Sequence, residues 1–438
     1  MLRLLLALCL FISSLAALTP AERQLNIDSF EKVWQTIRDS HWDPQLGGLN
    51  WSAVHDELRP KIERAATMDQ AREVMRDMIG RLHQSHFSII ASEVYGDLHD
   101  ASSGAAGEPG FDARVIGGKA LVASVETGSP AAEAGVHAGW EILSIDGASL
   151  NPVLERVGTE YRGSTLHDLY LARAVFSRLD GKIENKARIE FLDGTAEKRI
   201  LDIRRIPPRG KPTQFGFAPV MNVWIETRKI ENDIGYVSFN LFMDPARLMP
   251  RFEDAVKACA DCKGMIVDLR GNTGGIAFMA MGMAGFFIDR DDQRLGAMHM
   301  RESTLQFFVN PRKPFYGGPL AILVDGLSAS TSEIFAEGLK DLRRARIFGT
   351  PTAGAALPSV IEKLPNGDGF QYARASYTSA GGKPLEGAGV TPDVNVALTR
   401  ETLLAGRDAV LDAAVHWIQT QGIHTQGIHM RPKGNETE

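Results

Sequence analysis

Residues 323–340, LVDGLSASTSEIFAEGLK, decide how the rest of the chain is interpreted. An apolar run that ends at Val324 passes into a loop rich in hydroxyl groups, and a helical pattern begins near Ser332. Continuous apolar runs bounded by turn residues are typical of strands that are covered on both faces. The stretch therefore predicts a buried strand, a loop and a helix, which together form the repeating unit of an α/β fold.

The hydroxyl groups of this loop have two interpretations. They belong to Ser328, Ser330, Thr331 and Ser332. Ser330 and Glu333 have the spacing of a capping box, in which a serine and a glutamate close the first turn of a helix. A nucleophile at the same junction would be held at the mouth of the sheet, with the N–H groups of the helix N-terminus facing a developing oxyanion. The two roles do not exclude each other, so the residues alone leave both open.

The alternation of strand and helix extends from about residue 215 onward. Buried strands are predicted at 234–242, 264–271, 319–326 and 345–350, with helices at 244–259 and 276–288. The second of these strands ends in DLRGNTGG, residues 268–275, whose glycines permit a close approach of the backbone. Loops at the carboxyl ends of parallel strands meet at one edge of a sheet, where sites form. We therefore expect this turn to lie beside the serine loop and to offer a backbone N–H to an oxyanion.

Two further regions precede the α/β part, which is assigned to residues 215–420. Residues 20–100 are predicted to be a helical region, because apolar side chains recur there at helical spacing. Residues 105–206 have a strand-like pattern with a tight turn at Asp146-Gly147, which is typical of a small β domain. The chain is therefore expected to carry a small domain inserted between the helical region and the α/β domain.

The composition and the termini indicate where the protein acts. A net charge of −6 over 438 residues, without a Lys/Arg-rich stretch, argues against a nucleic-acid binder. Residues 1–16 predict a cleavable signal peptide, because Arg3 precedes an apolar run that is shorter than a membrane span. We therefore expect a secreted or periplasmic protein without stable membrane insertion, an uncleaved anchor being the alternative. The tail at 421–438 is predicted to be disordered.

The cysteines indicate neither a metal site nor a redox site. Cys259 and Cys262 are the two that follow the predicted signal peptide, and they form a C-A-D-C sequence. In an oxidising compartment this spacing allows a local disulfide, and no thioredoxin-like context surrounds it. Two cysteines without a Cys/His cluster do not fit a structural zinc site. The cysteine pattern therefore predicts neither a structural zinc site nor a redox site.

A nucleophilic serine needs a group that accepts its proton. Lys340 is the nearest base in the sequence, but it lies far down the predicted helix and would point away. Among the 11 histidines, His86 is notable because it follows a predicted helix and neighbours Ser85. A histidine at a helix end is more often structural, so the residues alone leave the role of His86 open.

Four motifs resemble, in their order, those of the carboxy-terminal processing proteases, the tail-specific serine peptidases of family S41. They are GSPAAEAGVHAGWEILSIDG at 128–147, DLRGNTGG at 268–275, DGLSASTSEIFAEGLKDLRRARIFGTPTAGAA at 325–356 and EGAGVTPDVNV at 386–396. The resemblance covers about residues 30–400, and the ordered combination is more specific than any single motif. It implies that Ser330 is the nucleophile. It also implies oxyanion donors at the N–H groups of Thr331 and Gly275, with Gly274 as the adjacent alternative.

The family divides over its general base. One branch uses a lysine at the position where this chain has Ala355, in TAGAA. The other branch, similar to the tricorn protease core, uses a Ser-His-Ser-Glu tetrad, whose further members match His86, Ser85 and Glu386 in this chain. Because the lysine is missing and the tetrad residues are present, the resemblance implies that His86 is the base and that Ser85 and Glu386 orient it.

The resemblance also implies a fold and a mode of substrate binding. Residues 128–147 resemble part of a PDZ domain, which implies that the small domain adds a peptide as a strand, with Gly110 and Phe111 in a carboxylate-binding loop. The α/β part is expected to have a ClpP/crotonase-like βαβ core. The expected function is that of a serine endopeptidase acting on C-terminal or unfolded peptide segments, with oligomerisation left open. The alternative is an inactive peptide- or ligand-binding protein on the same fold.

Overall fold

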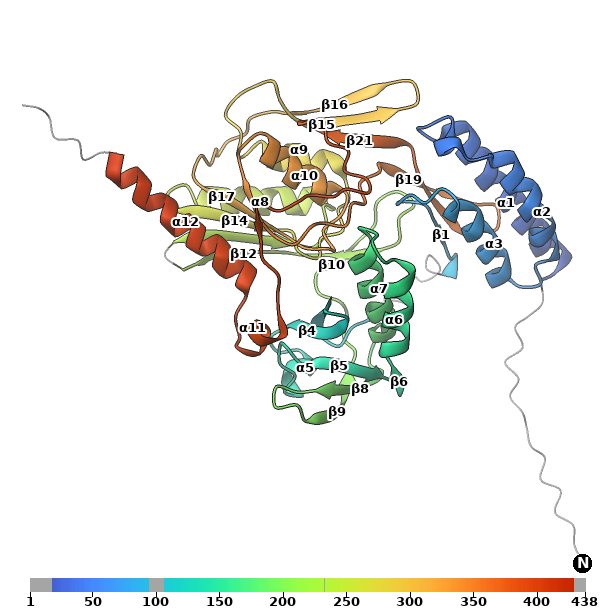
Figure 1. Ribbon diagram of the computed structural model, residues 1–438, viewed down its shortest axis with the longest axis horizontal. Coiled ribbons are helices and arrows are strands. Elements are labelled where there is room, and N and C mark those ends of the chain that lie inside the picture. Colours follow the sequence, from blue (N-terminus) through green and yellow to red (C-terminus); the bar gives the residue numbers. More distant parts are fainter. Residues whose placement is uncertain (1–17, 94–105, 232, 429–438) are drawn as a thin grey trace, which may run out of the picture.

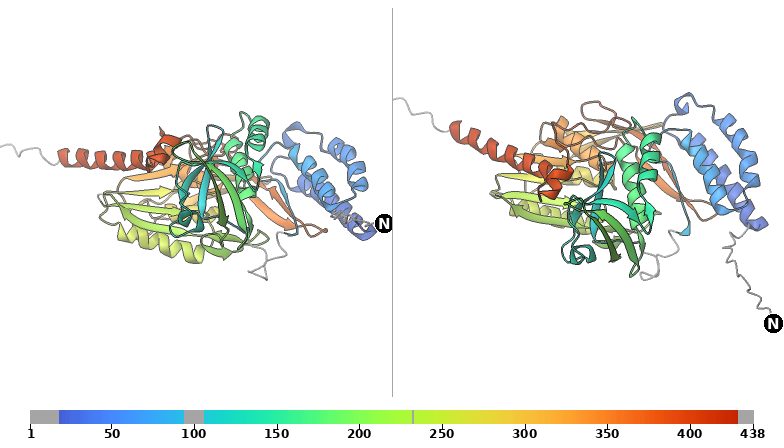
Figure 2. Two further views of the ribbon diagram at one scale, coloured as in Figure 1. Left: turned by 90° about the horizontal axis from the view of Figure 1, so that it is seen from below. Right: turned by 60° about the horizontal axis from the view of Figure 1, so that its bottom comes forward.

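The computed structural model of the chain describes residues 18–93, 106–231 and 233–428. The signal peptide predicted at residues 1–16 lies outside these ranges. The N-terminal helices lie at one end of the molecule, and helix α12 (Ala409–Ile428) projects from the other end (Figure 1). A small β-rich domain packs against the central α/β domain between these ends (Figure 2). None of the helices in the described ranges is both long enough and apolar enough to cross a membrane.

The N-terminal part consists mainly of three helices and a short strand. They are α1 (Pro20–Ser40), α2 (Trp51–Arg64), α3 (Met68–Gly80) and β1 (Ser88–Ile90). The apolar faces of the helices are buried against one another, as their helical periodicity predicts. Helix α3 does not continue to Ser85 and His86, because the chain passes through the left-handed backbone of His83 (φ 52°).

This part is fastened to the central domain on both sides of residues 85 and 86. Strand β1 pairs antiparallel with β20 (Gly369–Ala373), which also pairs with β19 (Ser359–Lys363). Arg72 on α3 donates to both carboxylate oxygens of the buried Asp368, at 3.0 and 2.8 Å. Ser92, after β1, donates its N–H to the same carboxylate at 2.8 Å. A bidentate Arg–carboxylate pair has a fixed geometry, so the segment between these contacts has a defined place.

The small domain has an antiparallel sheet in the order β3-β4-β5-β8-β9 and two helices of more than two turns. Its elements are β2 (Ala106–Gly107), β3 (Phe111–Ile116), β4 (Lys119–Val125), α5 (Pro130–Glu133), β5 (Glu141–Ile145), β6 (Ala148–Ser149), α6 (Asn151–Glu160), α7 (His167–Leu179), β7 (Gly181–Lys182), β8 (Lys186–Leu192) and β9 (Lys198–Arg204). The predicted Asp146-Gly147 turn has positive φ at both residues, as a tight hairpin turn requires. The domain has its own apolar core, which includes side chains of α6 and α7. Strand β3 is at the edge of the sheet.

The central domain is built on a six-stranded sheet in the order β12-β13-β14-β17-β18-β22. Its strands are β12 (Ile225–Ile230), β13 (Ile234–Phe239), β14 (Gly264–Asp268), β17 (Leu320–Val324), β18 (Arg346–Gly349) and β22 (Val394–Asn395). A hairpin of β10 (Lys211–Thr213) and β11 (Met221–Val223) leads into the sheet. From β13 to β22 neighbouring strands are parallel, and β12 is antiparallel to β13. The predicted α/β class is therefore confirmed.

Both faces of this sheet are covered, which explains the unbroken apolar runs of its strands. Helices α8 (Pro245–Ala258), α9 (Ala277–Ala284) and α10 (Thr331–Asp341) cover one face, and α12 covers the other (Figure 1). In β17, Ile322 and Val324 pack in the core of the first face, whereas Ala321 and Leu323 pack in the core with α12. Successive strand side chains point to opposite faces, so a strand buried on both faces is apolar throughout.

Several strands of the central domain outside this sheet are not predicted from the sequence, because they mix polar and apolar residues. Those strands are β15 (Gln293–Met300), β16 (Thr304–Val309), β19, β20 and β21 (Ala375–Ser379). The predicted start of the disordered tail at residue 421 is also corrected, because α12 continues to Ile428. Each glycine of the TQGIH repeat costs a helix only about 1 kcal/mol relative to alanine, which a helix can tolerate. Residues beyond 428 lie outside the described ranges.

Candidate active site

Two loops meet at the carboxyl edge of the parallel sheet, as the strand order predicts. They are the glycine-rich turn after β14, at 268–275, and the hydroxyl-rich loop after β17, at 325–332. Three hydroxyl groups of the second loop donate to main-chain oxygens of the first: Ser328 to Leu269 at 2.7 Å, Thr331 to Gly275 at 2.8 Å and Ser332 to Asn272 at 2.9 Å. All three donor side chains are buried. Their hydroxyl groups therefore hold the two loops together.

Ser330 is the exception among the four hydroxyl residues. It is half-buried, and its hydroxyl donates to no acceptor in the part of the chain that the structure describes. Its backbone has φ 57° and ψ −118°, an unusual conformation for a residue with a side chain. The predicted capping box with Glu333 is present, and the Ser330 N–H donates to Glu333 Oε2 at 2.8 Å. Ser330 thus caps helix α10 and retains an uncommitted hydroxyl proton.

Glu333 organises the loop around Ser330. Its carboxylate is fully buried and accepts hydrogen bonds from Ser330 N–H, Gly354 N–H at 2.8 Å, Ala355 N–H at 3.0 Å and Thr352 Oγ1 at 2.6 Å. Burial raises the pKa of Glu333 to about 7, and the four donors act in the opposite direction. One carboxylate therefore sets the positions of both the Ser330 loop and the loop at 352–356.

The glycine-rich turn separates the two oxyanion candidates left open by the sequence. The Gly274 N–H donates to the side-chain oxygen of the buried Asn272 at 2.9 Å. No acceptor within the described ranges is recorded for the N–H groups of Gly275 and Thr331. Gly274 has φ 95°, and a Cβ at this residue would lie 2.7 Å from Ser330 Cβ and 2.8 Å from Thr331 N. The absence of a side chain thus lets the turn approach the start of α10.

Hydrogen bonds link Ser85 and His86 to Glu386, which lies 301 residues after Ser85. Ser85 Oγ donates to Glu386 Oε2 at 2.8 Å, and the Ser85 N–H donates to Glu386 Oε1 at 2.8 Å. Ser85 Oγ also lies 2.7 Å from His86 Nδ1. A hydroxyl has one proton, so if it donates to the carboxylate it accepts from Nδ1–H. This network assigns the proton of the neutral imidazole to Nδ1 and leaves the lone pair on Nε2.

The electrostatic surroundings keep the imidazole of His86 neutral. Burial, followed by the positive charge of Arg173 on α7, lowers the pKa of His86 to about 4. Burial also raises the pKa of Glu386, although Ser85 and the Ala356 N–H donate hydrogen bonds to its carboxylate. At neutral pH the imidazole is therefore in the form that can accept a proton.

The loop at 352–356 connects the Ser330 loop to the residues around His86. No direct hydrogen bond joins Ser330 to His86 in the described residues. The Ala355 N–H donates to Glu333, and the Ala356 N–H donates to Glu386. Lys340 is excluded as a partner of Ser330, since its ammonium group donates to the Thr391 carbonyl and pairs with Asp393. The methyl group of Ala355 is buried.

The small domain borders both loops of the site. Arg114 on β3 donates to Asp325 Oδ2 at 2.9 Å, and Asp325 Oδ1 accepts the Gly271 N–H at 2.9 Å. Leu169 on α7 packs in an apolar cluster with Ala329 and Ala355. Helix α7 therefore packs against Ala329, the residue before Ser330, and against the loop that contains Ala355.

The two residues predicted to bind peptide, Gly110 and Phe111, lie at the start of β3. The Phe111 side chain is only 8% exposed and packs on Phe191 in the core of the small domain. The Gly110 carbonyl accepts hydrogen bonds from Ser129 Oγ at 2.9 Å and Glu126 N–H at 3.0 Å. Neither the Phe111 side chain nor the Gly110 carbonyl is therefore free for a ligand.

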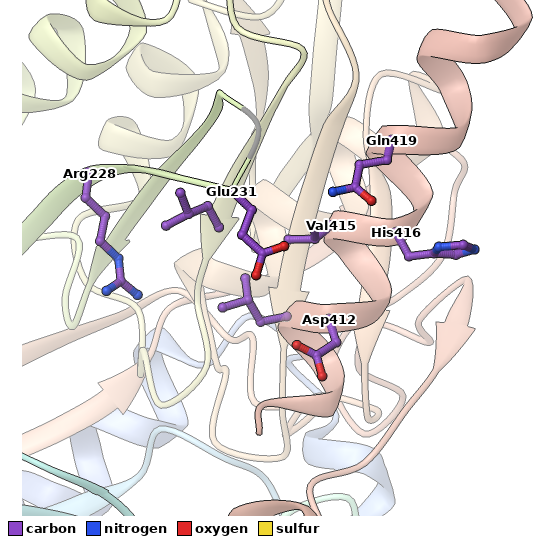
Figure 3. Close-up of a pocket in the computed structure, with 8 residues that line it drawn as sticks. Arg228, Glu231, Asp412, Val415, His416 and Gln419 are labelled. Carbon is purple, nitrogen blue, oxygen red and sulfur yellow. The ribbon is translucent and has the colours of Figure 1, made fainter. Parts of the chain in front are cut away.

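Two surface hollows lie away from these residues. A cavity of about 410 Å³ between β12 and α12 is lined by residues that include Arg228, Glu231 and His416 (Figure 3). Another of about 460 Å³ lies between the small domain and α11 (Arg400–Leu404). The described residues contain no group of three His, Cys, Asp or Glu side chains arranged to hold a metal ion. Cys259 and Cys262 are joined by a disulfide.

Several residues that shape the site are not predicted from the sequence. Asn272 is fully buried and ties the glycine-rich turn to Ser332 and to the Phe239 carbonyl, at 2.9 and 2.8 Å. Its place within DLRGNTGG is the sequence signal that could identify it. Glu333 is predicted from the sequence to be a helix cap, and its contacts with residues 352–355 have no local signature. Arg173 is one of many helix arginines in the sequence, so nothing in its neighbourhood distinguishes it.

Parts of the chain are similar to known protein families and to several relatives. Residues 233–396 match the family described as peptidase family S41, and residues 27–80 match the tricorn protease C1 domain. A carboxy-terminal-processing protease of Bartonella bacilliformis is 26% identical over 337 residues, which are 74% of this chain and 69% of the relative. A chloroplastic C-terminal processing peptidase of Tetradesmus obliquus is 24% identical over 378 residues, 84% of this chain and 76% of the relative.

A solved structure shows that the fold is shared. The photosystem II D1 C-terminal processing protease aligns with a TM-score of 0.57 and 21% identity, over 90% of this chain and 99% of that chain. The matched S41 segment begins just before β13 and ends just after β22, so it contains Ser330, Glu333, Glu386 and both loops of the site. The chain is therefore a serine-type peptidase in which residues 233–396 are similar to peptidase family S41.

Proposed function

We propose that the chain hydrolyses peptide bonds with Ser330 as nucleophile and His86 as general base, and that it does so without a metal or an organic cofactor. The observation that carries this proposal is the hydrogen-bonded chain from Glu386 through Ser85 to His86 Nδ1, at 2.8 and 2.7 Å. A histidine base must be held in one tautomer with its second nitrogen free. These hydrogen bonds hold the proton of His86 on Nδ1 and leave Nε2 free. The uncommitted hydroxyl of Ser330 supports the other half of the proposal.

The proposed reaction begins with attack of Ser330 Oγ on the scissile carbonyl carbon while His86 Nε2 takes the hydroxyl proton. No Oγ–His86 hydrogen bond is present among the described residues, and the proposed mechanism requires it to form in the complex, as catalytic hydrogen bonds often do. The oxyanion is bound by the N–H groups of Gly275 and Thr331, which have no acceptor within the described residues. The protonated His86 then gives its proton to the leaving amine, and the C–N bond breaks.

The second half of the reaction releases the acyl group. Water attacks the ester on Ser330, His86 takes a proton from the water, and Ser330 Oγ leaves with that proton. Throughout the reaction Ser85 and Glu386 keep the Nδ1–H in place and stabilise the positive charge on the imidazole. Glu386 acts through Ser85, since both of its oxygens are bonded to Ser85 and none to His86.

A fluorophosphonate probe tests the nucleophile directly. Wild-type protein is expected to be labelled and to hydrolyse a fluorogenic peptide, whereas Ser330→Ala should lose both properties and keep its melting temperature. His86→Ala should lose hydrolysis to a similar extent. Turnover by purified Ser330→Ala at the wild-type rate would disprove the assignment. An unlabelled and inert wild type would favour the alternative of a binding protein on the same fold.

The finer parts of the proposal concern substrate and location. We propose that the small domain acts as a PDZ-like module and receives an unfolded peptide segment along β3, whose position at the sheet edge supports strand addition. Gly110 and Phe111 would then contribute backbone groups alone. We propose a secreted or periplasmic location from the predicted signal peptide. Mass spectrometry of the exported N-terminus checks this, since cleavage after Ala16 is expected.

A further inference from the structure

We propose that His41, at the end of helix α1, is a positioning residue for the general base. Its side chain contacts the two residues that flank Ser85 and His86, and so limits the directions in which the imidazole of His86 can point. The proposal rests on the proposed function, because it takes His86 as the group that accepts the Ser330 proton. It goes beyond that function by giving a histidine of the N-terminal helices a part in the reaction.

The first argument is the strained backbone of the segment that carries the base. His83 has φ 52° and His86 has φ 61°, both in the left-handed region that residues with a side chain rarely adopt. Such conformations persist only where the surrounding structure holds them. Glu386 holds Ser85 in the middle of the segment. Contacts on either side of Ser85 and His86 therefore decide how far the imidazole can turn.

The second argument is that His41 supplies a contact on each side. His41 Nε2 lies 3.0 Å from Oε1 of Gln84, the residue before Ser85. The ring of His41 also stacks on the ring of Phe87, the residue after His86, with centroids 5.8 Å apart and an interplanar angle of 18°. The side chain that makes both contacts is itself buried, since His41 is only 1% exposed.

The third argument is that the hydrogen bonds of His41 select one tautomer. The Asp43 N–H donates to His41 Nδ1 at 3.0 Å, and a ring nitrogen that accepts a hydrogen bond carries no proton. The proton is therefore on Nε2, which donates to Gln84 Oε1. The Asp43 carbonyl also lies 2.9 Å from Nδ1. The other tautomer would donate to this carbonyl and would leave two acceptors, Nε2 and Gln84 Oε1, facing each other.

The fourth argument is that the central domain holds the main chain of His41. Arg301 lies in the turn between β15 and β16, which reaches the end of α1 (Figure 1). Its side chain donates to the His41 carbonyl at 3.1 Å and to the Arg38 carbonyl at 3.0 Å. His41 is thus fixed to the same domain that carries Ser330. Through Gln84 and Phe87 it therefore fixes the base relative to the nucleophile.

The alternative is that His41 only stabilises the packing of the N-terminal helices. His55 has such a structural role and offers a matched control. Its Nε2 lies 3.2 Å from both carboxylate oxygens of Glu31, and its ring contacts the rings of Phe30 and Trp34. None of these partners belongs to residues 84–87. A difference in kinetics between substitutions of the two histidines therefore separates positioning from stability.

Two variants remove the contact from its two ends. His41→Phe keeps a ring that can stack on Phe87 and removes the Nε2–H, and Gln84→Leu removes the acceptor at a partly exposed residue. Each should lower kcat by about 10- to 100-fold with little change in KM, because a displacement of about 1 Å at a reacting group has an effect of that size. The double variant should be no slower than the slower single variant, since both remove the same hydrogen bond.

Two further variants complete the kinetic comparison. His41→Gln keeps a side-chain N–H that can donate to Gln84, and it should retain more activity than His41→Phe. His55→Phe should lower the melting temperature and leave kcat unchanged, because its partners do not reach the base. Rates are compared at a temperature at which all the variants are folded.

NMR of isotopically labelled histidine rings provides a measurement that does not depend on turnover. In Ser330→Ala protein the His86 ring, assigned by its absence from His86→Ala, should have a protonated Nδ1 and an unprotonated Nε2. Adding His41→Phe should give signals averaged between the two tautomers, because the segment is no longer held. Adding His55→Phe should leave the His86 signals unchanged.

Four results would overturn the proposal. They are an unchanged kcat in either His41→Phe or Gln84→Leu, effects that multiply in the double variant, a fall in kcat in His55→Phe as large as in His41→Phe, or His86 signals that do not respond to His41→Phe. Failure of the proposed function gives a different pattern. An inert wild type whose His86 signals still respond to His41→Phe would refute the reaction assigned to Ser330 and support positioning by His41.

Discussion

Glu333 and Glu386 accept hydrogen bonds from two successive backbone amides. The Ala355 N–H donates to Glu333 Oε2 and the Ala356 N–H to Glu386 Oε2, both at 3.0 Å. Glu333 holds the N–H of Ser330, and Glu386 holds Ser85, the neighbour of His86. This loop thus connects the proposed nucleophile to the residues that orient the proposed base. Displacement of either carboxylate is expected to move one reacting group relative to the other.

The first prediction concerns Glu333→Gln. An amide has one acceptor oxygen and presents an NH₂ group to backbone N–H donors, so at least one of the four donors that face Glu333 loses its partner. We expect a loss of stability of about 1–3 kcal/mol, the cost of an unsatisfied buried group, and a fall in kcat. Urea unfolding and steady-state kinetics measure the two effects. Unchanged stability would mean that the four contacts are not formed in solution.

The second prediction concerns the link between Ser85 and His86. Ser85→Ala removes the hydroxyl that bridges Glu386 and His86 Nδ1, so the imidazole loses its fixed tautomer. By analogy with loss of the orienting group in other triads, kcat should fall by about 10²–10⁴-fold with little change in KM. Ser85→Thr keeps a hydroxyl and should retain more activity than Ser85→Ala. Equal activity of the two variants would show that the bridge has no catalytic role.

The third prediction concerns pH. The base must be neutral to accept a proton, and its pKa is lowered from the ordinary 6.5 to about 4. The acid limb of kcat/KM should therefore lie near pH 4 rather than near pH 6.5. Arg173→Met removes one of the two causes and should move this limb to higher pH, with Glu386 still facing the imidazole through Ser85. An acid limb near pH 6.5 in both proteins would contradict the burial of the imidazole.

The same shift has a consequence for stability. The folded-state pKa of His86 is below its unfolded value, so folding is opposed when the unfolded chain binds a proton that the native site does not. Protonation of His86 in the unfolded chain should not affect the free energy of unfolding above pH 6.5. It should lower that free energy progressively as the pH falls from 6.5 toward about 4. His86→Ala should have a flatter profile of melting temperature between these two pH values.

The fourth prediction concerns Gly274. A Cβ there would lie 2.7 Å from Ser330 Cβ, and φ is 95°, so Gly274→Ala should push the glycine-rich turn away from Thr331. Displacement of an oxyanion donor costs about 10²–10³-fold in kcat, and we expect an effect of that size. Gly382→Ala is the matched control, since its φ is 82° and no atom lies within 4 Å of the added Cβ. It should cost some stability and leave kcat unchanged.

The fifth prediction concerns Ala355, at the position where the resemblance implies a lysine in the other branch of the family. Ala355 is 4% exposed and shares an apolar cluster with Leu169, so a lysine must displace helix α7 or bury a charge. Ala355→Lys should therefore be less stable, by about 1–3 kcal/mol from overpacking. It should also fail to restore hydrolysis to His86→Ala. Activity in that double variant would show that the site can operate with a lysine base.

Much of the central domain could be predicted from the sequence. The runs around Ile266 and Ile322 are apolar without interruption because helices cover both faces of the sheet, and that pattern is local. The strands β15, β16 and β19–β21 could not be predicted in this way, since their partners are distant and their faces are partly exposed. The capping box at Ser330 and Glu333 could be predicted because it involves two residues in one helical turn.

The sequence by itself thus determined the α/β class, the two strand-end loops and the set of residues among which the site would be found. The tertiary structure decided which members of that set are free to react. Ser328, Thr331 and Ser332 use their hydroxyl protons on a loop some 60 positions away, and the Gly274 N–H is occupied by Asn272. It also decided that His86 faces Glu386 through Ser85. Hydrogen bonds between distant loops leave no periodic trace in a sequence, because each depends on how the whole chain packs.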